Sequence, residues 1–161
     1  MTKEEKQLLL QDLCARLSYG VNIFYEITDE TGNTHTYDGY ILYELSNDGQ
    51  HITLLNYDDK HGVCEVDIEC GVFKPYLRSL SSMTEEEKEE MHNLLSPEGT
   101  AIYENDGIVL PLNHCGEFVP YEFMNRIIQY LLKHHFDFMG LIPKNLAMVV
   151  TEENNPYEND N

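Results

Sequence analysis

The fold class is decided at residues 21–28, which read VNIFYEIT. Apolar side chains recur here at every second position, which is the period of a half-buried β-strand. Three further stretches with this alternation follow at residues 35–45, 51–56 and 63–69. Short segments rich in Asp, Asn and Gly separate them, and Gly39 in the second stretch is typical of a bulge or a sharp bend. The region predicts a small curved antiparallel sheet of about four strands, or in its closed form an SH3-like barrel.

Helical patterns flank the predicted sheet. Thr2 and Glu5 have the spacing of a capping box, in which each side chain satisfies a backbone amide, and predict a helix over residues 2–17. Apolar side chains at helical spacing form its stripe, namely Leu9, Leu10, Leu13, Cys14 and Leu17. The capping pattern recurs at Thr84 with Glu87 and predicts a second helix.

A third helix is expected to begin near Pro120, since proline suits the first helical position. Its apolar positions at residues 123–132 predict packing into the core, with an oligomeric interface as the alternative. Residues 71–83 are expected to connect the sheet to the second helix, because Pro75 disfavours a helix before it.

The fold class is therefore predicted as α+β, with one helix before the sheet and two or more after it. The chain has 161 residues, of which 42% are hydrophobic, as in an ordinary folded protein. We expect a single α+β domain over residues 1–150 and an acidic, flexible C-terminal tail over residues 151–161. The absence of a 20-residue apolar run excludes a membrane-spanning helix on the sequence pattern.

The cysteines and the N-terminus indicate a cytoplasmic protein. Cys14, Cys64, Cys70 and Cys115 contain no Cys-x-x-Cys pair, and we interpret them as scattered buried thiols of a reducing compartment. The first six residues read MTKEEK and do not have the pattern of a signal peptide.

Charge restricts the possible partners. The chain carries 29 acidic and 10 basic residues, a formal net charge of −19, which excludes a protein that binds nucleic-acid phosphates directly. Residues 21–73 contain eleven acids and one base, so about half of the negative charge belongs to the predicted sheet. Clustered negative potential of this kind steers association with a basic surface.

One acidic row stands out in the last predicted strand. Glu65, Asp67 and Glu69 alternate there with apolar residues and therefore share one face. Asp58 and Asp59 lie in the adjoining turn. A simply solvated face and a site for a hard cation are the alternatives. The hypothesis we carry forward is a non-enzymatic protein that contacts a basic partner through these five residues.

A second hypothesis is a metal-binding protein or a cysteine-dependent hydrolase. His61 and Cys64 have a spacing suited to metal ligands, and His114 with Cys115 would complete a set of four. The adjacent His134 and His135 project about 100° apart on a helix, so they suit a helix end better than a metal site. Gly-rich nucleotide motifs, His-Glu-x-x-His and Gly-x-Ser-x-Gly are absent, and no cofactor is predicted.

Three segments together carry a resemblance. They are MTKEEKQLLLQDLCARL at residues 1–17, KPYLRSLSSMTEE at residues 74–86, and HFDF with GLIP at residues 135–138 and 140–143. The chain resembles a family of short uncharacterised proteins from gut bacteria and their phages or mobile elements. The resemblance implies no activity, cofactor or site residue. Combined with the charge, it suggests an accessory protein, or an inhibitor of a basic partner that itself binds nucleic acid.

Overall fold

The computed structural model describes residues 1–56, 62–68, 70–95, 101–105, 108–112 and 121–157. These residues form two compact units, one built from residues 1–77 and 139–161 and the other from residues 78–138. The single domain over residues 1–150 and the flexible tail stay predictions. No helix in the described ranges is both long and apolar enough to cross a lipid bilayer.

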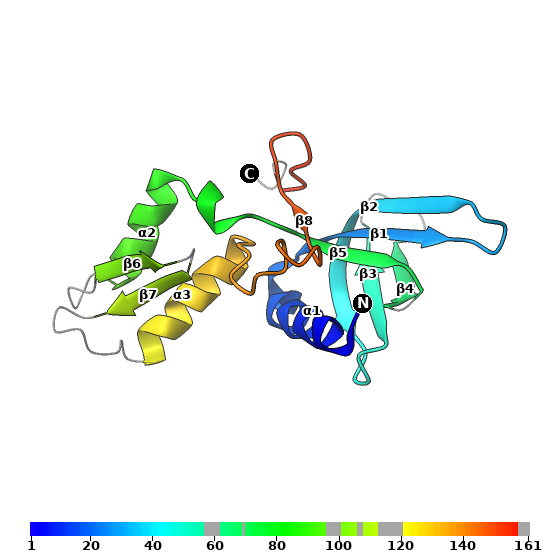
Figure 1. The fold of residues 1–161 in the computed structure, drawn as a ribbon, viewed down its shortest axis with the longest axis horizontal. Helices are drawn as coiled ribbons and strands as arrows, with labels where there is room; N and C mark the ends of the chain where they lie inside the picture. The colour runs from blue at the N-terminus through cyan, green and yellow to red at the C-terminus, as the bar shows by residue number, and fades with distance from the viewer. Residues whose placement is uncertain (57–61, 69, 96–100, 106–107, 113–120, 158–161) are drawn as a thin grey trace. The chain divides into compact units, whose positions relative to one another are not determined.

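The first unit contains a six-stranded mixed sheet (Figure 1). Its elements are α1 (Lys3–Arg16), a 3-10 turn η1 (Leu17–Tyr19), β1 (Asn22–Thr28), β2 (Thr34–Leu45), β3 (His51–Leu55), β4 (Val63–Asp67), β5 (Val72–Leu77) and β8 (Met148–Val149). The strand order is β4-β3-β2-β1-β5-β8, and among the described strands β5 and β8 alone run parallel. The α+β class and the four predicted strands are confirmed. The prediction of a closed SH3-like barrel is wrong, because the described strands form an open sheet.

The connection expected at residues 71–83 instead contains strand β5 in its first half, at Val72–Leu77. Pro75 lacks the N–H that a ladder between two neighbours requires. It pairs with Ile23 of β1, whereas β8 begins only opposite Tyr76, so the strand has one neighbour at the proline among the described residues. The proline is therefore compatible with the strand.

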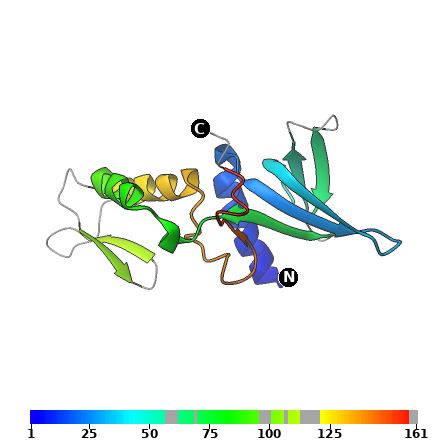
Figure 2. The same cartoon turned by 90° about the horizontal axis from the view of Figure 1, so that it is seen from above.

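The hairpin of β1 and β2 extends beyond the other strands (Figures 1 and 2). Ile23 faces Tyr40 and Tyr25 faces Tyr37, so β2 contains extra residues at this point. Gly39 lies within this irregularity with a φ of 75°, a left-handed conformation that favours glycine. The bulge predicted at Gly39 is confirmed.

Helix α1 packs on the sheet through a face that differs in part from the predicted stripe. Leu9 and Leu13 enter the core with residues from the strands of the sheet. Asp12 and Arg16, one turn apart, are also fully buried at 0% exposure. The expected stripe positions Cys14 and Leu17 are exposed, because the buried face follows positions 9, 12, 13 and 16.

The cysteines are less buried than expected. Cys14 and Cys70 are exposed, and Cys64 is half-buried against the core. The interpretation of buried thiols is thus wrong for the first two, and Cys115 lies outside the described residues.

The second unit contains a short 3-10 turn η2 (Leu80–Ser82), α2 (Glu85–Leu95), the hairpin of β6 (Ala101–Asn105) and β7 (Ile108–Leu112), and α3 (Tyr121–Lys133). The capping box at Thr84 and Glu87 is confirmed, since each backbone amide donates to the other residue's side chain. Ile127 and Leu131 of α3 lie in the core of this unit, as the predicted apolar face required.

Residues 151–157 belong to the first unit and make contacts with its sheet. The hydroxyl of Tyr157 donates to the carbonyl of Tyr76 at 2.8 Å and accepts from the amide of Asn22 at 3.2 Å. Val150 donates its backbone amide to Leu77. These bonds join the C-terminal segment to strands β1 and β5.

Candidate functional site

The side of β2, β3 and β4 that faces away from the core is here called the outer face. Ile52, Leu54 and Val66 point into the core, so the residues that alternate with them project from the opposite side. The outer face consists of Ile41, Glu44, His51, Thr53, Leu55, Val63, Glu65 and Asp67.

The strand register arranges the outer face in three rows. Ile41, Leu55 and Val63 form an apolar row across the three strands. Glu44, Thr53 and Glu65 form an acidic row beside it. His51 lies opposite Asp67 in the third row. Directly paired residues lie about 4.5–5.5 Å apart, so apolar and acidic side chains adjoin on one surface.

Strand β4 is one edge of the sheet. Within the described part of the chain it pairs with β3 alone. Val63 is 62% exposed and Glu65 is also exposed. An edge strand directs part of its backbone N–H and C=O groups away from the sheet, where they can pair with another chain. This edge thus combines an exposed backbone with acidic and apolar side chains.

The predicted acidic row is brought together in part. Glu65 is exposed and Asp67 half-buried, and both lie on the outer face as the alternation predicted. Asp58, Asp59 and Glu69 lie outside the described residues. Glu44 joins the row through Thr53, a neighbour that sequence reasoning missed. A shift of register between Leu42 and Glu44 produces this placement.

Two turns of the sheet hold further carboxylates in their ionised form. The Ser46 hydroxyl and the Gln50 amide donate to Asp48 at 2.6 Å and 3.0 Å, and they lower the pKa of that carboxyl. Asp29 accepts from the hydroxyl of Thr31 at 2.6 Å, and this bond, followed by that of His35, lowers its pKa strongly. Both negative charges therefore persist into acidic solution.

The proposed His and Cys ligands receive no support from the part that the structure describes. Cys64 lies half-buried against the core, and burial raises the pKa of its thiol, which disfavours the reactive thiolate. His61, His114 and Cys115 lie outside the described residues, so the four-ligand cluster stays a prediction. Within the described ranges, no three His, Cys, Asp or Glu side chains are placed to hold a metal ion.

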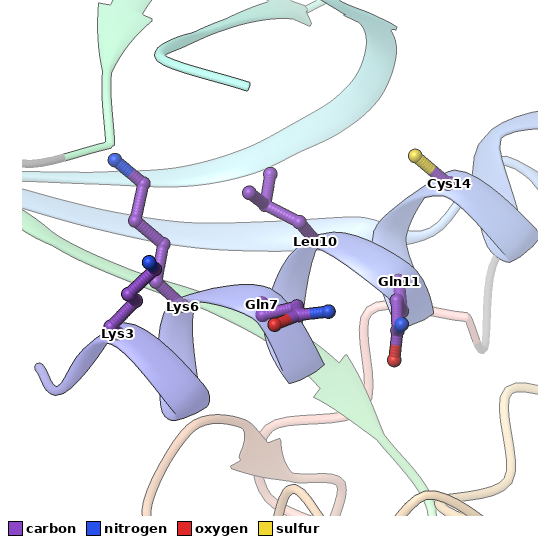
Figure 3. A pocket seen from close by; sticks show the side chains of 6 residues that line it. All are labelled: Lys3, Lys6, Gln7, Leu10, Gln11 and Cys14. Carbon is purple, nitrogen blue, oxygen red and sulfur yellow. The ribbon is translucent and has the colours of Figure 1, made fainter. Parts of the chain in front are cut away.

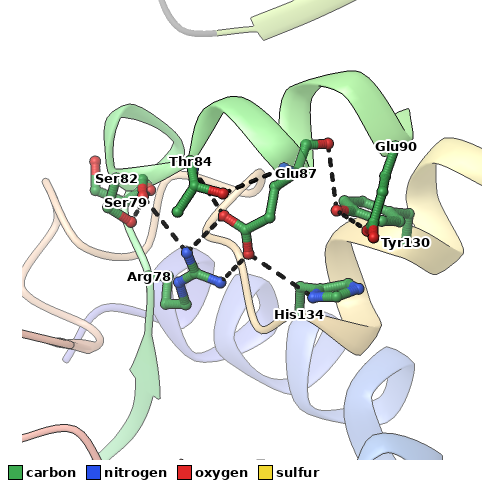
Figure 4. A network of polar contacts seen from close by, with 8 residues as sticks. All are labelled: Arg78, Ser79, Ser82, Thr84, Glu87, Glu90, Tyr130 and His134. Atoms are coloured by element: carbon green, nitrogen blue, oxygen red, sulfur yellow. Dashed lines mark hydrogen bonds and ion pairs between the residues drawn. The ribbon is translucent and has the colours of Figure 1, made fainter. Parts of the chain in front are cut away.

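A separate polar network occupies the second unit (Figure 4). The Arg78 guanidinium donates to both carboxylate oxygens of Glu87, at 2.5 Å and 2.8 Å, and lies 4.3 Å from the centre of the Phe136 ring. Glu87 also accepts the backbone amide of Thr84 at 2.8 Å. The pairing of Arg78 with a carboxylate therefore joins the start of α2 to the segment after β5.

The end of α3 completes this network. The His134 ring stacks on Tyr130 with centroids 4.3 Å apart, and its Nδ1 lies 3.9 Å from Glu87. The Tyr130 hydroxyl donates to Glu90 at 3.0 Å. Burial lowers the pKa of His134, and burial together with Glu90 raises the pKa of Tyr130. Both groups are thus neutral near pH 7, and their contacts hold the two helices together.

No family model, curated protein or solved structure matches the chain. The resemblance to proteins of gut bacteria and their mobile elements therefore stays a prediction. The outer face and the β4 edge are the features on which a functional conclusion rests.

Proposed function

We propose that the chain is a non-enzymatic, cytoplasmic protein-binding module whose outer face contacts a basic surface of another protein. The proposed centre of the contact is Glu65, Asp67 and Glu69, and the sequence adds Asp58 and Asp59 of the adjoining turn as further contact residues. The proposal depends on the edge position of β4 within the described sheet, where exposed Val63 lies beside exposed Glu65 at the end of the acidic row.

The composition of this surface supports a protein partner. Protein interfaces combine an apolar centre with a polar rim, and the outer face places an apolar row beside an acidic one. Ten of the nineteen net negative charges fall within residues 21–73, where eleven acids accompany one base. A field of one sign accelerates encounter with a surface of the opposite sign and excludes acidic competitors.

A basic protein that binds nucleic acid is the partner class we propose. Carboxylates spaced along a sheet would occupy the lysines and arginines that otherwise contact phosphates. An accessory protein of a phage or mobile element that inhibits such a partner is the biological role that fits this chemistry.

The test is affinity capture from native lysate at low salt, with elution by a salt gradient and mass spectrometry. The Glu65→Lys/Asp67→Lys variant reverses the charge at two residues of the proposed centre. A matched Glu152→Lys/Glu153→Lys variant makes the same change of net charge at two exposed residues elsewhere in the unit. We expect a basic protein that is retained by the matched variant and lost with the β4 variant.

Double-stranded DNA added during capture adds a second readout. If the partner binds nucleic acid through the same basic surface, DNA should displace it from the immobilised chain. Equal capture by the wild-type chain and by the β4 variant would contradict the proposed function.

A further inference from the structure

The hydrogen bonds at the two ends of the β3–β4 ladder fix which residues of β4 bond to β3. The amide of Asn56 donates to the carbonyl of Gly62 at 2.9 Å. At the other end, the amide of Ile68 donates to the carbonyl of Gln50 at 3.0 Å. Both pairs continue the register of the two strands, in which every second pair is hydrogen-bonded. Between them, bonding to β3 therefore falls on Cys64 and Val66.

The alternating residues of β4 direct their backbone away from the sheet. In an antiparallel pair, the N–H and C=O groups between two hydrogen-bonded pairs point to the opposite side. These residues are Val63, Glu65 and Asp67, and in the described part of the sheet no strand lies beyond them. The carbonyl of Asp67 accepts the amide of Cys70 at 3.1 Å. The backbone of Val63 and Glu65 is therefore the part of the edge to which a further strand can bond.

The side chains at this edge determine what kind of strand fits. Val63 is 62% exposed and Glu65 is also exposed, and both belong to the outer face. On the other side of the strand, Val66 is buried and Cys64 is half-buried against the core. An incoming strand therefore meets one acidic and one apolar side chain on its first face, and apolar side chains on its second.

A second copy of the chain is poorly matched to this edge. Two antiparallel β4 strands that pair about Glu65 would place their Glu65 carboxylates directly opposite each other, with Cα atoms about 5.5 Å apart. Like charges in that arrangement destabilise a sheet, and each copy carries a net charge of −19. The edge therefore favours a segment that places a lysine or an arginine opposite Glu65.

We propose that the edge of β4 binds an extended basic segment of the partner protein, which adds to the sheet as a further antiparallel strand. Its residue opposite Glu65 is basic, its residue opposite Val63 is apolar, and its residues opposite Cys64 and Val66 are apolar. Main-chain hydrogen bonds supply affinity in such strand additions, and alternate side chains supply specificity. This inference rests on the proposed function, because it names the element of the basic partner that the same surface recognises.

The probe is the peptide acetyl-Lys-Lys-Val-Lys-Val-Val-Lys-amide, whose central lysine is placed opposite Glu65. Two N-methylated forms keep its sequence and charge. Methylation of the central lysine removes the N–H that would donate to the Glu65 carbonyl. Methylation of the next valine changes an N–H that points away from β4. In NMR spectra of the full-length chain, amide chemical shifts measure binding and amide exchange rates measure strand pairing.

Saturation with the unmodified peptide should slow exchange of the Val63 and Glu65 amides by about tenfold or more. The Cys64 and Val66 amides already bond to β3 and should change little. Methylation of the central lysine should weaken binding about tenfold, which corresponds to about 1.4 kcal/mol. Methylation of the adjacent valine should leave binding unchanged, so the difference between the two forms isolates the backbone contribution from the charge.

A hollow along α1 serves as the reference for binding elsewhere on the same unit (Figure 3). Its described lining contains no acidic residue, and Figure 3 shows Leu10 and Cys14 on the same side of the helix. The amide shifts of these two residues should stay constant while those of Val63 and Glu65 move. Peptide-induced shifts at Leu10 and Cys14 in place of β4 would contradict the proposed site.

The variant Val63→Pro tests the same pairing with a whole partner protein. It removes an N–H that points away from β3 and keeps every acidic residue. Proline is tolerated at such a position of an edge strand, as Pro75 is where β5 has one described neighbour. The matched Val63→Ala variant removes the side chain and keeps the N–H. In affinity capture, the basic protein should be retained by Val63→Ala and lost with Val63→Pro, with circular dichroism showing that both variants are folded.

The outcomes separate this inference from the proposed function. Strand addition is overturned if the peptide binds without slower exchange at Val63 and Glu65, if the two methylated forms bind equally, or if about 1 mM peptide causes no shift. Capture that survives Val63→Pro but is lost with Glu65→Lys/Asp67→Lys also overturns it, and leaves the proposed function standing. Failure of the wild-type chain to capture a basic protein contradicts the proposed function, whereas the peptide measurements still decide strand addition.

Discussion

Arg16 and Asp12 form a buried ion pair on the core side of α1. The Arg16 Nε lies 2.6 Å from one carboxylate oxygen of Asp12, and a second bond of 3.0 Å joins the other oxygen. Both side chains are fully buried. A buried charge is tolerated only while its partner is present, so each residue depends on the other.

Removing one member of this pair should destabilise the first unit strongly. Arg16→Ala leaves the Asp12 carboxylate buried without its guanidinium, and we expect a loss of about 3–5 kcal/mol in the free energy of unfolding. Urea denaturation followed by circular dichroism measures it. The apolar double variant Asp12→Leu/Arg16→Met should lose far less. A Lys88→Ala variant removes the exposed pair with Glu85 and should cost at most about 1 kcal/mol.

Gly71 is required because a side chain at this position would clash with its neighbours, not because of its backbone conformation. A Cβ at this position would collide with the carbonyl oxygen of Glu26 and approach the Tyr25 ring to 2.8 Å. Gly71→Ala should therefore cost roughly 2–3 kcal/mol or more in unfolding free energy. Gly39→Ala is the comparison, since space is open there and only the left-handed φ opposes it, at about 1–2 kcal/mol. Equal urea midpoints for the two variants would refute the steric argument.

At the scale of residues, local signals were predictable and long-range ones were not. The capping boxes at Thr2 and Thr84 depend on neighbours three positions away and could be predicted from sequence. Gly20 follows the turn η1 with a left-handed φ of 64°, a conformation that favours glycine. Asp12 and Arg16 carried no such signal, because charged residues on a helix ordinarily face solvent.

At the scale of elements, alternation identified the strands that have one buried face. Strand β5 was not predicted, because a proline is unusual within a strand. Pro75 is tolerated there because β5 has one neighbouring strand at that position among the described residues, and this pairing is not visible in the sequence. Strand β8 has two residues, which is too short for any periodic pattern. Helix α2 was predictable because its cap and its three acidic residues in the first turn are local features.

The contact between α2 and α3 should weaken in acid. Burial holds the pKa of His134 below its ordinary value of 6.5, so folding favours the neutral ring. The stability it contributes is present above pH 6.5 and is lost as the pH falls through the lowered pKa. Burial raises the pKa of Glu87, but donors from Arg78 and Thr84 outweigh it and hold this pKa below 4.5. The stability that the ionised Glu87 carboxylate contributes is therefore lost only at a lower pH, as the pH falls through this lowered pKa.

Hydrogen exchange of the amides of α3 measures this effect. Their protection should fall as the pH is lowered below 6.5 and through the lowered pKa of His134, after correction for the intrinsic exchange rate. His134→Phe keeps a ring to stack on Tyr130 without a titrating group, and it should flatten the pH dependence. His92→Phe replaces an exposed histidine of α2 and should leave the dependence as it is. A wild-type slope in the His134 variant would exclude this histidine as the cause.

At the scale of the whole chain, charge was predictable and its arrangement was not. The sequence alone predicted an acidic face on the last of four strands, and Glu65 and Asp67 lie on it. Glu44 lies in the acidic row because the register of β2 and β3 shifts between Leu42 and Glu44. The sheet is open rather than closed into a barrel because of the order in which its strands pair. Both features come from pairing between distant residues, which periodicity does not encode.

Salt should move stability and binding in opposite directions. A net charge of −19 repels itself in the folded chain, so screening should raise the urea midpoint as sodium chloride increases from about 0.05 M to about 0.5 M. The same screening should weaken capture of a basic partner by about an order of magnitude. Sodium chloride and sodium sulfate at equal ionic strength separate screening from specific ion effects. Binding that survives high salt while the midpoint rises would indicate a contact dominated by the apolar row of Ile41, Leu55 and Val63 rather than by Glu65 and Asp67.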